Sequence, residues 1–437
     1  MDRMRAILRN GDWVTRERVR VVAFAVLAAS LAGFLFLVVT AHGLVDRQGR
    51  PLGTDFSSFY AAGSYVIDGR PEAPFNLAQQ YTREQQIFGG GTPFYSWFYP
   101  PFFLFIAGAL ALMPYGLALA VWQLVTLCFY LLTIKEILRP IARQDGERNV
   151  SAGPLWLLLA LAFPAVLINV GHGQNGFLTA ALLGAGLVQL DRRPFIAGVL
   201  FGCLAYKPQF GLMIPLVLAA SGRWRPFGVA AATVAVLASA TLAVFGAHVW
   251  QAFLDATRFA RVVALEQGDV SWYKIQSVFA WARMWGASVP IAYVLQGVLD
   301  LAVAASLVRL WRNAATPYAL KAAGLCLAVI LGTPFVLDYD MMVPAPAIAF
   351  FAVDGFIRGF GPWEKTALAV LWLTPLAARS VAQVTLIPLG VLAMLAMFVV
   401  ILRRAELGHA LPMAFVGTPS TMADGGPARG HDIAAFE

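Results

Sequence analysis

The sequence predicts an all-α polytopic membrane protein with about twelve membrane-spanning helices. Of its 437 residues, 59% are hydrophobic and only 13% are charged, which is too apolar for a domain whose core is built against water. Apolar runs recur along most of the chain, and the longest can cross about 30 Å of hydrocarbon. Inside lipid, helices satisfy every backbone polar group within the segment. The expected fold is therefore a helical bundle embedded in a bilayer.

The first apolar run, residues 21–45, follows a basic segment and at first sight resembles a signal peptide. It is too long for one and lacks a cleavage site of the small-x-small type, so we interpret it as an uncleaved first span. The remaining runs are divided by prolines, glycines and charged residues. The spans are predicted near residues 21–42, 116–134, 154–170, 177–190, 195–206, 209–220, 227–246, 288–309, 318–334, 341–354, 366–380 and 384–402.

The stretch from Tyr99 to Ile134 is broken at Met113-Pro114 into two apolar pieces. Two crossings there would place the arginine clusters of the later loops outside, against the positive-inside rule. We therefore expect residues 101–112 to form a re-entrant or interfacial helix. This choice places the N-terminus and most lysines and arginines in the cytoplasm.

The predicted organisation has three parts. Residues 1–20 form a basic cytoplasmic N-terminus, residues 21–404 form the transmembrane domain, and residues 405–437 form a disordered cytoplasmic tail. Two long outer segments, about 43–99 and 247–287, are rich in Trp, Tyr and Phe, as is typical of segments that lie on a membrane surface. Within the first, a short interfacial helix is expected over residues 57–67.

Composition also excludes several functions. The net charge of +8 does not gather on one folded domain, so it marks topology and does not indicate nucleic-acid binding. The three cysteines lie in apolar stretches without metal or disulfide spacing. The chain has no Walker loop, no His-Glu-x-x-His and no Gly-x-Ser-x-Gly motif. We predict no metal and no cofactor.

Asp55 is the best candidate for a catalytic base, because it lies just past the first span at the start of an aromatic loop. Tyr60 and the later Tyr99 are the polar aromatic residues of the same loop that are expected near it. The alternative is that Asp55 only caps the helix that follows, while the aromatic residues form an interfacial belt.

Two further polar groups fall on the same outer side in this topology. The turn of residues 171–176 offers His172, Gln174 and Asn175 on a glycine-rich backbone that can hold a phosphate or a sugar, or else serves only as a tight turn with a capping Asn. Lys207 precedes Pro208 between two apolar segments. A lysine at membrane depth usually faces a cavity and marks function, although it can also snorkel to an ordinary interface.

The last candidates are Asp338 and Asp340, which follow Pro334, and Gln276 of the second outer segment. Asp338-Tyr339-Asp340 superficially matches the Asp-x-Asp metal motif of nucleotide-sugar transferases. That motif works in a soluble domain, for which neither outer segment is long enough. We expect these residues, with Tyr60, to bind the acceptor or to support the site, and capping is the alternative for either acid.

The order and spacing of these segments resemble glycosyltransferase family 87. This family belongs to the GT-C superfamily and includes polyprenyl-phosphate-mannose-dependent mannosyltransferases. The resemblance runs from about residue 50 to residue 350. The segments that carry it are Asp55-Phe56, Tyr99-Pro100-Pro101, Gly173-Gln174-x-Gly176, Arg193-Pro194-x-x-Ala197-Gly198, Lys207-Pro208 and residues 334–340.

The resemblance implies a GT-C-like bundle whose extracytoplasmic active site, in the cell inner (plasma) membrane, uses a polyprenyl-phosphate-linked sugar and a lipid or glycan acceptor. Asp55 corresponds to the base of an inverting transfer, and Lys207 to a residue that binds the donor phosphate. We expect four further residues to help bind the donor: His172, Gln174, Asn175 and Tyr99. The chain departs from the pattern after Pro334, where some members have a histidine. The competing hypotheses are a transporter or flippase of lipid-linked sugars, which would predict repeated halves, and a non-catalytic subunit.

Overall fold

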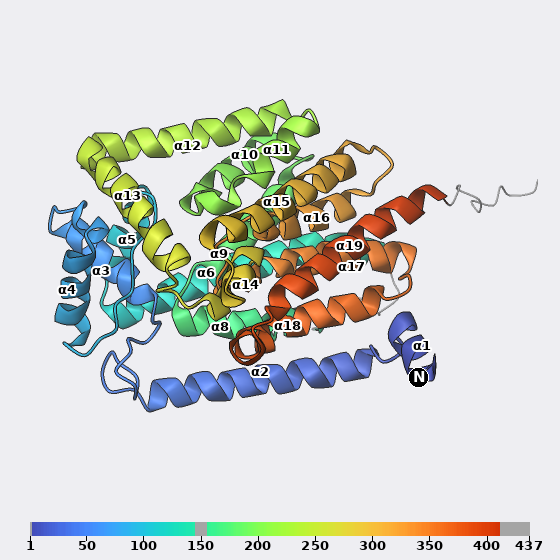
Figure 1. Cartoon of the computed structure of the whole chain (residues 1–437), viewed down its shortest axis with the longest axis horizontal. Helices are drawn as coiled ribbons and strands as arrows, with labels where there is room; N and C mark the ends of the chain where they lie inside the picture. Colours follow the sequence, from blue (N-terminus) through green and yellow to red (C-terminus); the bar gives the residue numbers. More distant parts are fainter. Residues whose placement is uncertain (1, 145–154, 411–437) are drawn as a thin grey trace, which may run out of the picture.

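The computed structural model describes residues 2–144 and 155–410, and within these ranges every regular element is a helix. Figure 1 shows a bundle in which several long helices, among them α2 and α12, run roughly along the longest axis of the molecule. The prediction of an all-α fold is confirmed. α19 (Leu389–Ala410) runs past the predicted start of the cytoplasmic tail, and residues 411–437 of that tail lie outside the described residues.

Six helices of the described chain are long and apolar enough to cross a membrane. A seventh span is possible where α7 (Leu155–Leu161) and α8 (Pro164–His172) meet at a bend of 46°. The predicted twelve spans are therefore not confirmed. The six are α2 (Arg16–Val39), α6 (Tyr115–Gln144), α12 (Trp224–Phe245), α15 (Val289–Arg312), residues 338–358 with α17 (Pro344–Arg358), and α18 (Glu364–Thr385).

The predicted span 384–402 corresponds to α19, which has 22 residues and is not among these six helices. Four other predicted spans are present as helices too short to pass the same test. Helix starts in the bundle follow ordinary chemistry, since the short helices α8 and α10 and the long helix α15 each carry a proline in the first turn, where its missing N–H is not needed. The four shorter helices are α9 (Gly176–Gln189), α10 (Pro194–Cys203), α11 (Met213–Ala220) and α16 (Tyr318–Leu331).

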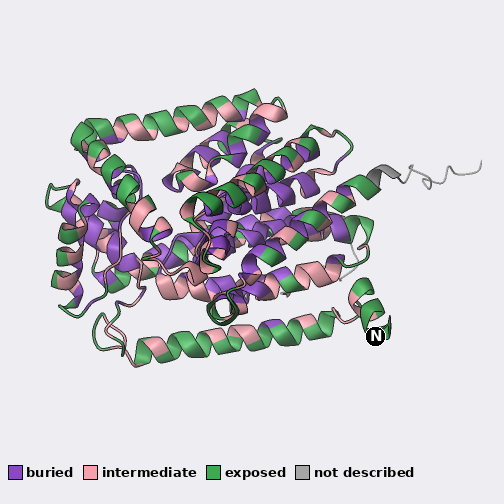
Figure 2. Cartoon of the chain, in the orientation of Figure 1, coloured by how far each residue is buried: buried purple, intermediate pink, exposed green. Residues whose placement is uncertain are grey.

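The core lies in the middle of the bundle, around α9, α16 and α17 (Figure 2). From Leu320 to Leu331 every residue of α16 is buried, because neighbouring helices cover it on all sides. α2 and α12 lie at opposite edges and are mostly exposed, as expected for helices whose outer faces meet lipid chains. This burial pattern fits a membrane protein with an internally packed centre.

The first outer segment contains α3 (Phe56–Ile67), where the short helix over residues 57–67 was predicted, and α4 (Leu77–Phe88), which was not predicted. After an extended stretch, α5 (Phe103–Ala111) lies within the predicted helix of residues 101–112. α3 packs closely against α5, where a side chain at Gly63 would meet the carbonyl of Ala107. At about 1.5 Å per residue, the nine residues of α5 are too short to cross a bilayer. The structure therefore supports a re-entrant or interfacial helix here.

The second outer segment contains α13 (Ala247–Ala260), a π-helical turn over residues 261–266, and α14 (Val278–Met284). It contacts the first outer segment, because the rings of Phe75 and Phe253 lie 5.9 Å apart and His248 approaches Glu72 at 3.6 Å. In Figure 1, α13 lies beside α3–α5 at one end of the molecule. The two predicted outer segments therefore lie at the same end.

A buried ion-pair cluster marks the opposite end of the bundle. Arg404 of α19 binds Asp354 of α17 and Glu364 of α18, and α1 (Asp2–Asn10) packs on the start of α18, where the N–H of Trp363 donates to the carbonyl of Arg9 at 2.6 Å. This cluster lies at the C-terminal ends of α17 and α19 and at the start of α18. The start of α17 and the end of α18 therefore lie at the other end of these helices. Those ends carry residues of the candidate site.

Candidate active site

Asp55 lies in the turn that leads into α3, and its carboxylate faces the bundle. Gln174 Nε2 donates to Asp55 Oδ2 at 3.0 Å, and Thr54 Oγ1 donates to Oδ1 at 3.4 Å. The backbone N–H of Asp55 also donates to the carbonyl of His172 at 3.0 Å. Asp55 makes no side-chain cap on α3, so the simple capping alternative is not supported by this geometry.

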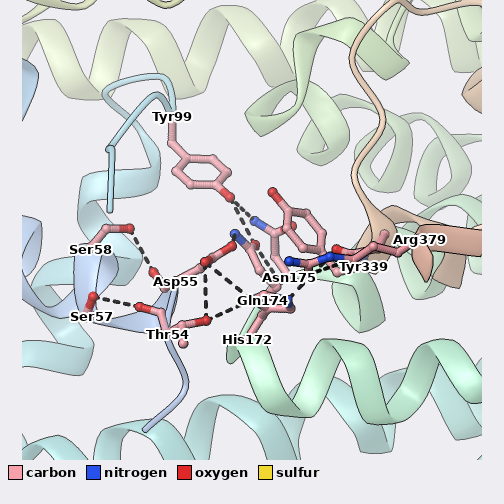
Figure 3. A network of polar contacts seen from close by, with 11 residues as sticks. Thr54, Asp55, Ser57, Ser58, Tyr99, His172, Gln174, Asn175, Tyr339 and Arg379 are labelled. Carbon is pink, nitrogen blue, oxygen red and sulfur yellow. Dashed lines mark hydrogen bonds and ion pairs between the residues drawn. The ribbon is translucent and has the colours of Figure 1, made fainter. Parts of the chain in front are cut away.

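The 171–176 turn reaches Asp55 because glycine permits a sharp reversal after α8. Gly173 has φ of +63°, and a side chain there would meet Phe56. The N–H of Gly176 is taken by Asn169 Oδ1 at 2.7 Å, so Asn175 does not cap α9. Instead, Asn175 Nδ2 donates to the Tyr99 hydroxyl at 2.9 Å, and that hydroxyl donates to Gln174 Oε1 at 3.1 Å. Figure 3 shows this network.

His172 connects the first outer segment with the segment before α17. Its Nδ1 lies 2.8 Å from Thr54 Oγ1 and 3.5 Å from Asp55 Oδ1, while its Nε2 lies 3.9 Å from Asp338 Oδ1. The imidazole therefore stands between two carboxylates that are 283 residues apart in the chain, counted as 338 minus 55.

Lys207 lies where the helical path from α10 to α11 is broken, because Pro208 has no N–H and restricts the residue before it. Its side chain is 4% exposed and its ammonium binds Asp340 Oδ1. The ammonium also lies 4.9 Å from the centre of the Tyr339 ring. Asp340 Oδ2 accepts the N–H of Leu337 at 3.0 Å, so Asp340 both caps the turn and neutralises the lysine.

Arg379 completes the cluster, and we did not anticipate it from the sequence. It lies in α18 and donates from Nη1 to Asp338 Oδ2 at 3.2 Å. Figure 3 shows it beside Tyr339, on the far side of His172 from Thr54. An arginine inside an apolar span indicates a candidate functional residue, and the sequence carries this signal at Arg379.

Two predicted residues are not brought into this network. The Tyr60 hydroxyl donates to the carbonyl of Met113 at 2.9 Å and so ties α3 to the turn before α6. Gln276 Oε1 accepts the N–H of Gly390 at 3.0 Å, which holds the second outer segment against the start of α19. Both contacts stabilise the segments that surround the site.

The pKa of Asp55 lies below its ordinary value. Burial alone would raise it, but the charge interaction with His172 and the hydrogen bonds from His172, Gln174 and Thr54 together outweigh burial. Asp55 is therefore held as the carboxylate, which is the form that can accept a proton.

Replacing His172 with Gln should raise the pKa of Asp55, because it removes the largest interaction that lowers it. The loss of activity on acidification should then begin at a higher pH than in the wild type. A pH profile of kcat/KM measures this shift, and His248→Gln, at an exposed histidine of α13, is the matched control. An acid limb that does not move in His172→Gln would contradict this account of Asp55.

A second acid, Glu84 of α4, is fully buried near the site and was not singled out in the sequence. Its Oε2 accepts the N–H of Tyr95 at 2.9 Å, and Gln80 Nε2 donates to Oε1 at 3.3 Å. It thereby fixes the extended stretch that carries Tyr99. Burial raises the pKa of Glu84 to about 8.

Because the folded-state pKa of Glu84 is raised, its favourable contribution to stability is full below the ordinary pKa of 4.5 and is lost as the pH rises through about 8. Glu84→Gln cannot ionise, so its melting temperature should exceed that of the wild type increasingly between about pH 5 and about pH 9. Thermal unfolding at several pH values measures the difference. The control is Glu136→Gln, at an exposed position of α6, and an equal pH dependence in Glu84→Gln and wild type would refute the prediction.

Comparison with known proteins gives one family match. The model of glycosyltransferase family 87 matches residues 97–335, which is more than half of the chain. No curated protein and no solved structure matches. The matched range contains Tyr99, the 171–176 turn and Lys207, whereas Asp55, Asp338 and Arg379 lie outside it and are joined to it by the contacts described above.

Proposed function

The chain belongs to glycosyltransferase family 87 and is a membrane glycosyltransferase, and from this premise we propose that it transfers a sugar from a polyprenyl-phosphate donor to an acceptor hydroxyl. The reaction takes place at the extracytoplasmic face of the inner (plasma) membrane, and the acceptor is a lipid or a glycan. The sugar is mannose or another hexose or pentose. We also propose that the fold of this chain is related to that of the GT-C superfamily.

Asp55 is the general base of this proposal. As the acceptor hydroxyl attacks the anomeric carbon, the Asp55 carboxylate takes its proton, and the bond from that carbon to the phosphate oxygen breaks with inversion. The carboxylate suits this role because its hydrogen bonds come from Gln174 and Thr54 and hold it ionised in a fixed orientation. The leaving phosphate needs no proton, so a separate acid is not required.

The donor phosphate lies on the side of the site lined by Lys207, the 171–176 turn and Tyr99. Lys207 and Asp340 form a buried pair, which fixes the ammonium beside the Tyr339 ring at the wall of the site. Gln174 and Asn175 contribute amide groups, and His172 stands between this side and Asp55. Donors fixed before the reaction stabilise the charge that develops on the leaving group.

The observation that carries the proposal is the convergence of chain segments from 54–55, 99, 172–175, 338–340 and 379 into one polar network inside an otherwise apolar bundle. Burying so many polar and charged groups costs free energy, and such groups inside a membrane protein usually mark a functional site. A base, amides and cations within one network match the needs of transfer from a sugar phosphate.

The test is transfer by the purified protein in lipid nanodiscs. Polyprenyl-phosphate sugars should be consumed and a glycosylated lipid or glycan formed, whereas nucleotide sugars should give no product. In sealed vesicles, movement of the intact donor between leaflets without a new glycosidic bond would instead favour a lipid-linked sugar transporter and would overturn the proposal.

A further inference from the structure

Arg379 is an unusual residue for its position. It lies six residues before Thr385, the last residue of α18, which is one of the helices apolar enough to span a membrane. A charged side chain at such a position is costly unless it is paired, hydrated or bound to an anion. Its side chain is 43% exposed, although the Asp338 carboxylate that it contacts is only 10% exposed. The guanidinium is therefore accessible next to a buried acid.

The contacts of Arg379 leave most of its hydrogen-bonding capacity unused. A guanidinium carries five N–H donors, and within residues 2–144 and 155–410 the structure gives Arg379 one hydrogen bond, from Nη1 to Asp338 Oδ2. That contact fixes the side chain at the site, because Asp338 Oδ1 in turn faces His172 Nε2 at 3.9 Å. Arg379 is thus held in place through one edge while the rest of the guanidinium remains available.

Lys207 differs from Arg379 in its exposure and in how fully its charge is already bound. Its side chain is 4% exposed, its ammonium is already bound by Asp340, and the Phe210 and Tyr339 rings lie 5.5 and 4.9 Å from it. Arg379 is therefore the more accessible of the two cations, whereas Lys207 is enclosed in the wall of the site.

We propose that Arg379 is a direct binding residue for the phosphate of the polyprenyl-linked donor, an inference that rests on the function proposed above. The guanidinium fork matches two phosphate oxygens better than a point charge does. During transfer the bond between the anomeric carbon and the phosphate oxygen breaks, and its electron pair stays on that oxygen. The acceptor proton passes to Asp55. The departing polyprenyl phosphate therefore gains negative charge, which Arg379 stabilises.

The test compares Arg379→Gln with wild type in nanodiscs, using a polyprenyl-phosphate sugar as substrate and polyprenyl phosphate as product inhibitor. The KM for the donor and the inhibition constant of polyprenyl phosphate should both rise by about 10- to 100-fold, which is the usual effect of removing a charged hydrogen bond. Arg379→Lys should recover part of the loss, because it restores charge without the fork. Arg258→Gln, at an exposed arginine of α13, should change neither constant.

A structural role is separated from phosphate binding by Asp338→Asn, which removes the negative charge that pairs with Arg379 but keeps the guanidinium. If Arg379 only pairs with Asp338, both variants will lower the melting temperature alike and leave the inhibition constant unchanged, which would overturn the inference. If the wild type transfers sugar and folded Arg379→Gln binds polyprenyl phosphate as well as the wild type does, the inference fails while the proposed function stands. A wild type that does not use polyprenyl-phosphate sugars would end both.

Discussion

Replacing Asp55 with Asn should lower kcat by about 100- to 10,000-fold, which is the range for losing a positioned general base. The substitution keeps the size of the side chain, but it replaces one of the two accepting oxygens with an NH2 group and removes the ability to accept a proton. Donor binding should change only a few-fold, because in the proposal the donor phosphate lies against Lys207 and the 171–176 turn. Single-turnover transfer assays and donor-binding measurements on the same preparation separate the two effects.

The matched control is Asp68→Asn, at the opposite end of α3. Asp68 is exposed and pairs with Arg83, so its replacement should cost little stability and leave transfer unchanged. Activity of Asp55→Asn at the wild-type rate would remove the base assignment. A loss of donor binding as large as the loss of kcat would show that Asp55 acts by shaping the site.

The second large effect is expected at Lys207. Lys207→Met removes one partner of a buried ion pair and leaves Asp340 without its cation, which typically costs about 3–5 kcal/mol. The melting temperature of the purified protein should fall sharply, and transfer should fall with it. This single variant does not distinguish a folding defect from lost phosphate binding.

The double variant Lys207→Met with Asp340→Asn makes that distinction. Removing both charges takes away the uncompensated acid, so stability should return toward the wild-type value. If Lys207 also contacts the donor phosphate, the KM for the donor should remain raised in the folded double variant. A double variant with normal stability and a normal donor KM would show that the lysine serves the fold alone.

Sequence reasoning located most helices because apolar periodicity and chain breaks at Pro and Gly are local signals. The twelve predicted spans are not confirmed, because several of them correspond to short apolar helices. α10 and α11 are separated at Lys207-Pro208, and each buries only some of its residues against neighbouring helices. Their apolar character therefore reflects internal packing as well as contact with lipid. Composition alone does not distinguish these two environments.

The site was predictable where a polar group interrupts an apolar run, as at Asp55, the 171–176 turn and Lys207. Arg379 carried the same signal but was read as part of a span. Tyr60 was selected for its proximity in sequence to Asp55, and Gln276 for its place in the second outer segment. Their side chains bind backbone groups of the segments around the site. Which partner each side chain takes depends on tertiary packing and has no local signature.

The most direct test of the central claim is an experimental map of the Asp55→Asn variant in nanodiscs with a bound polyprenyl-phosphate sugar. We expect the anomeric carbon to face the side chain at position 55, with the phosphate on the side of Arg379 and Lys207. Sugar phosphate density away from this network, or a wall of side chains between position 55 and the phosphate, would contradict the account.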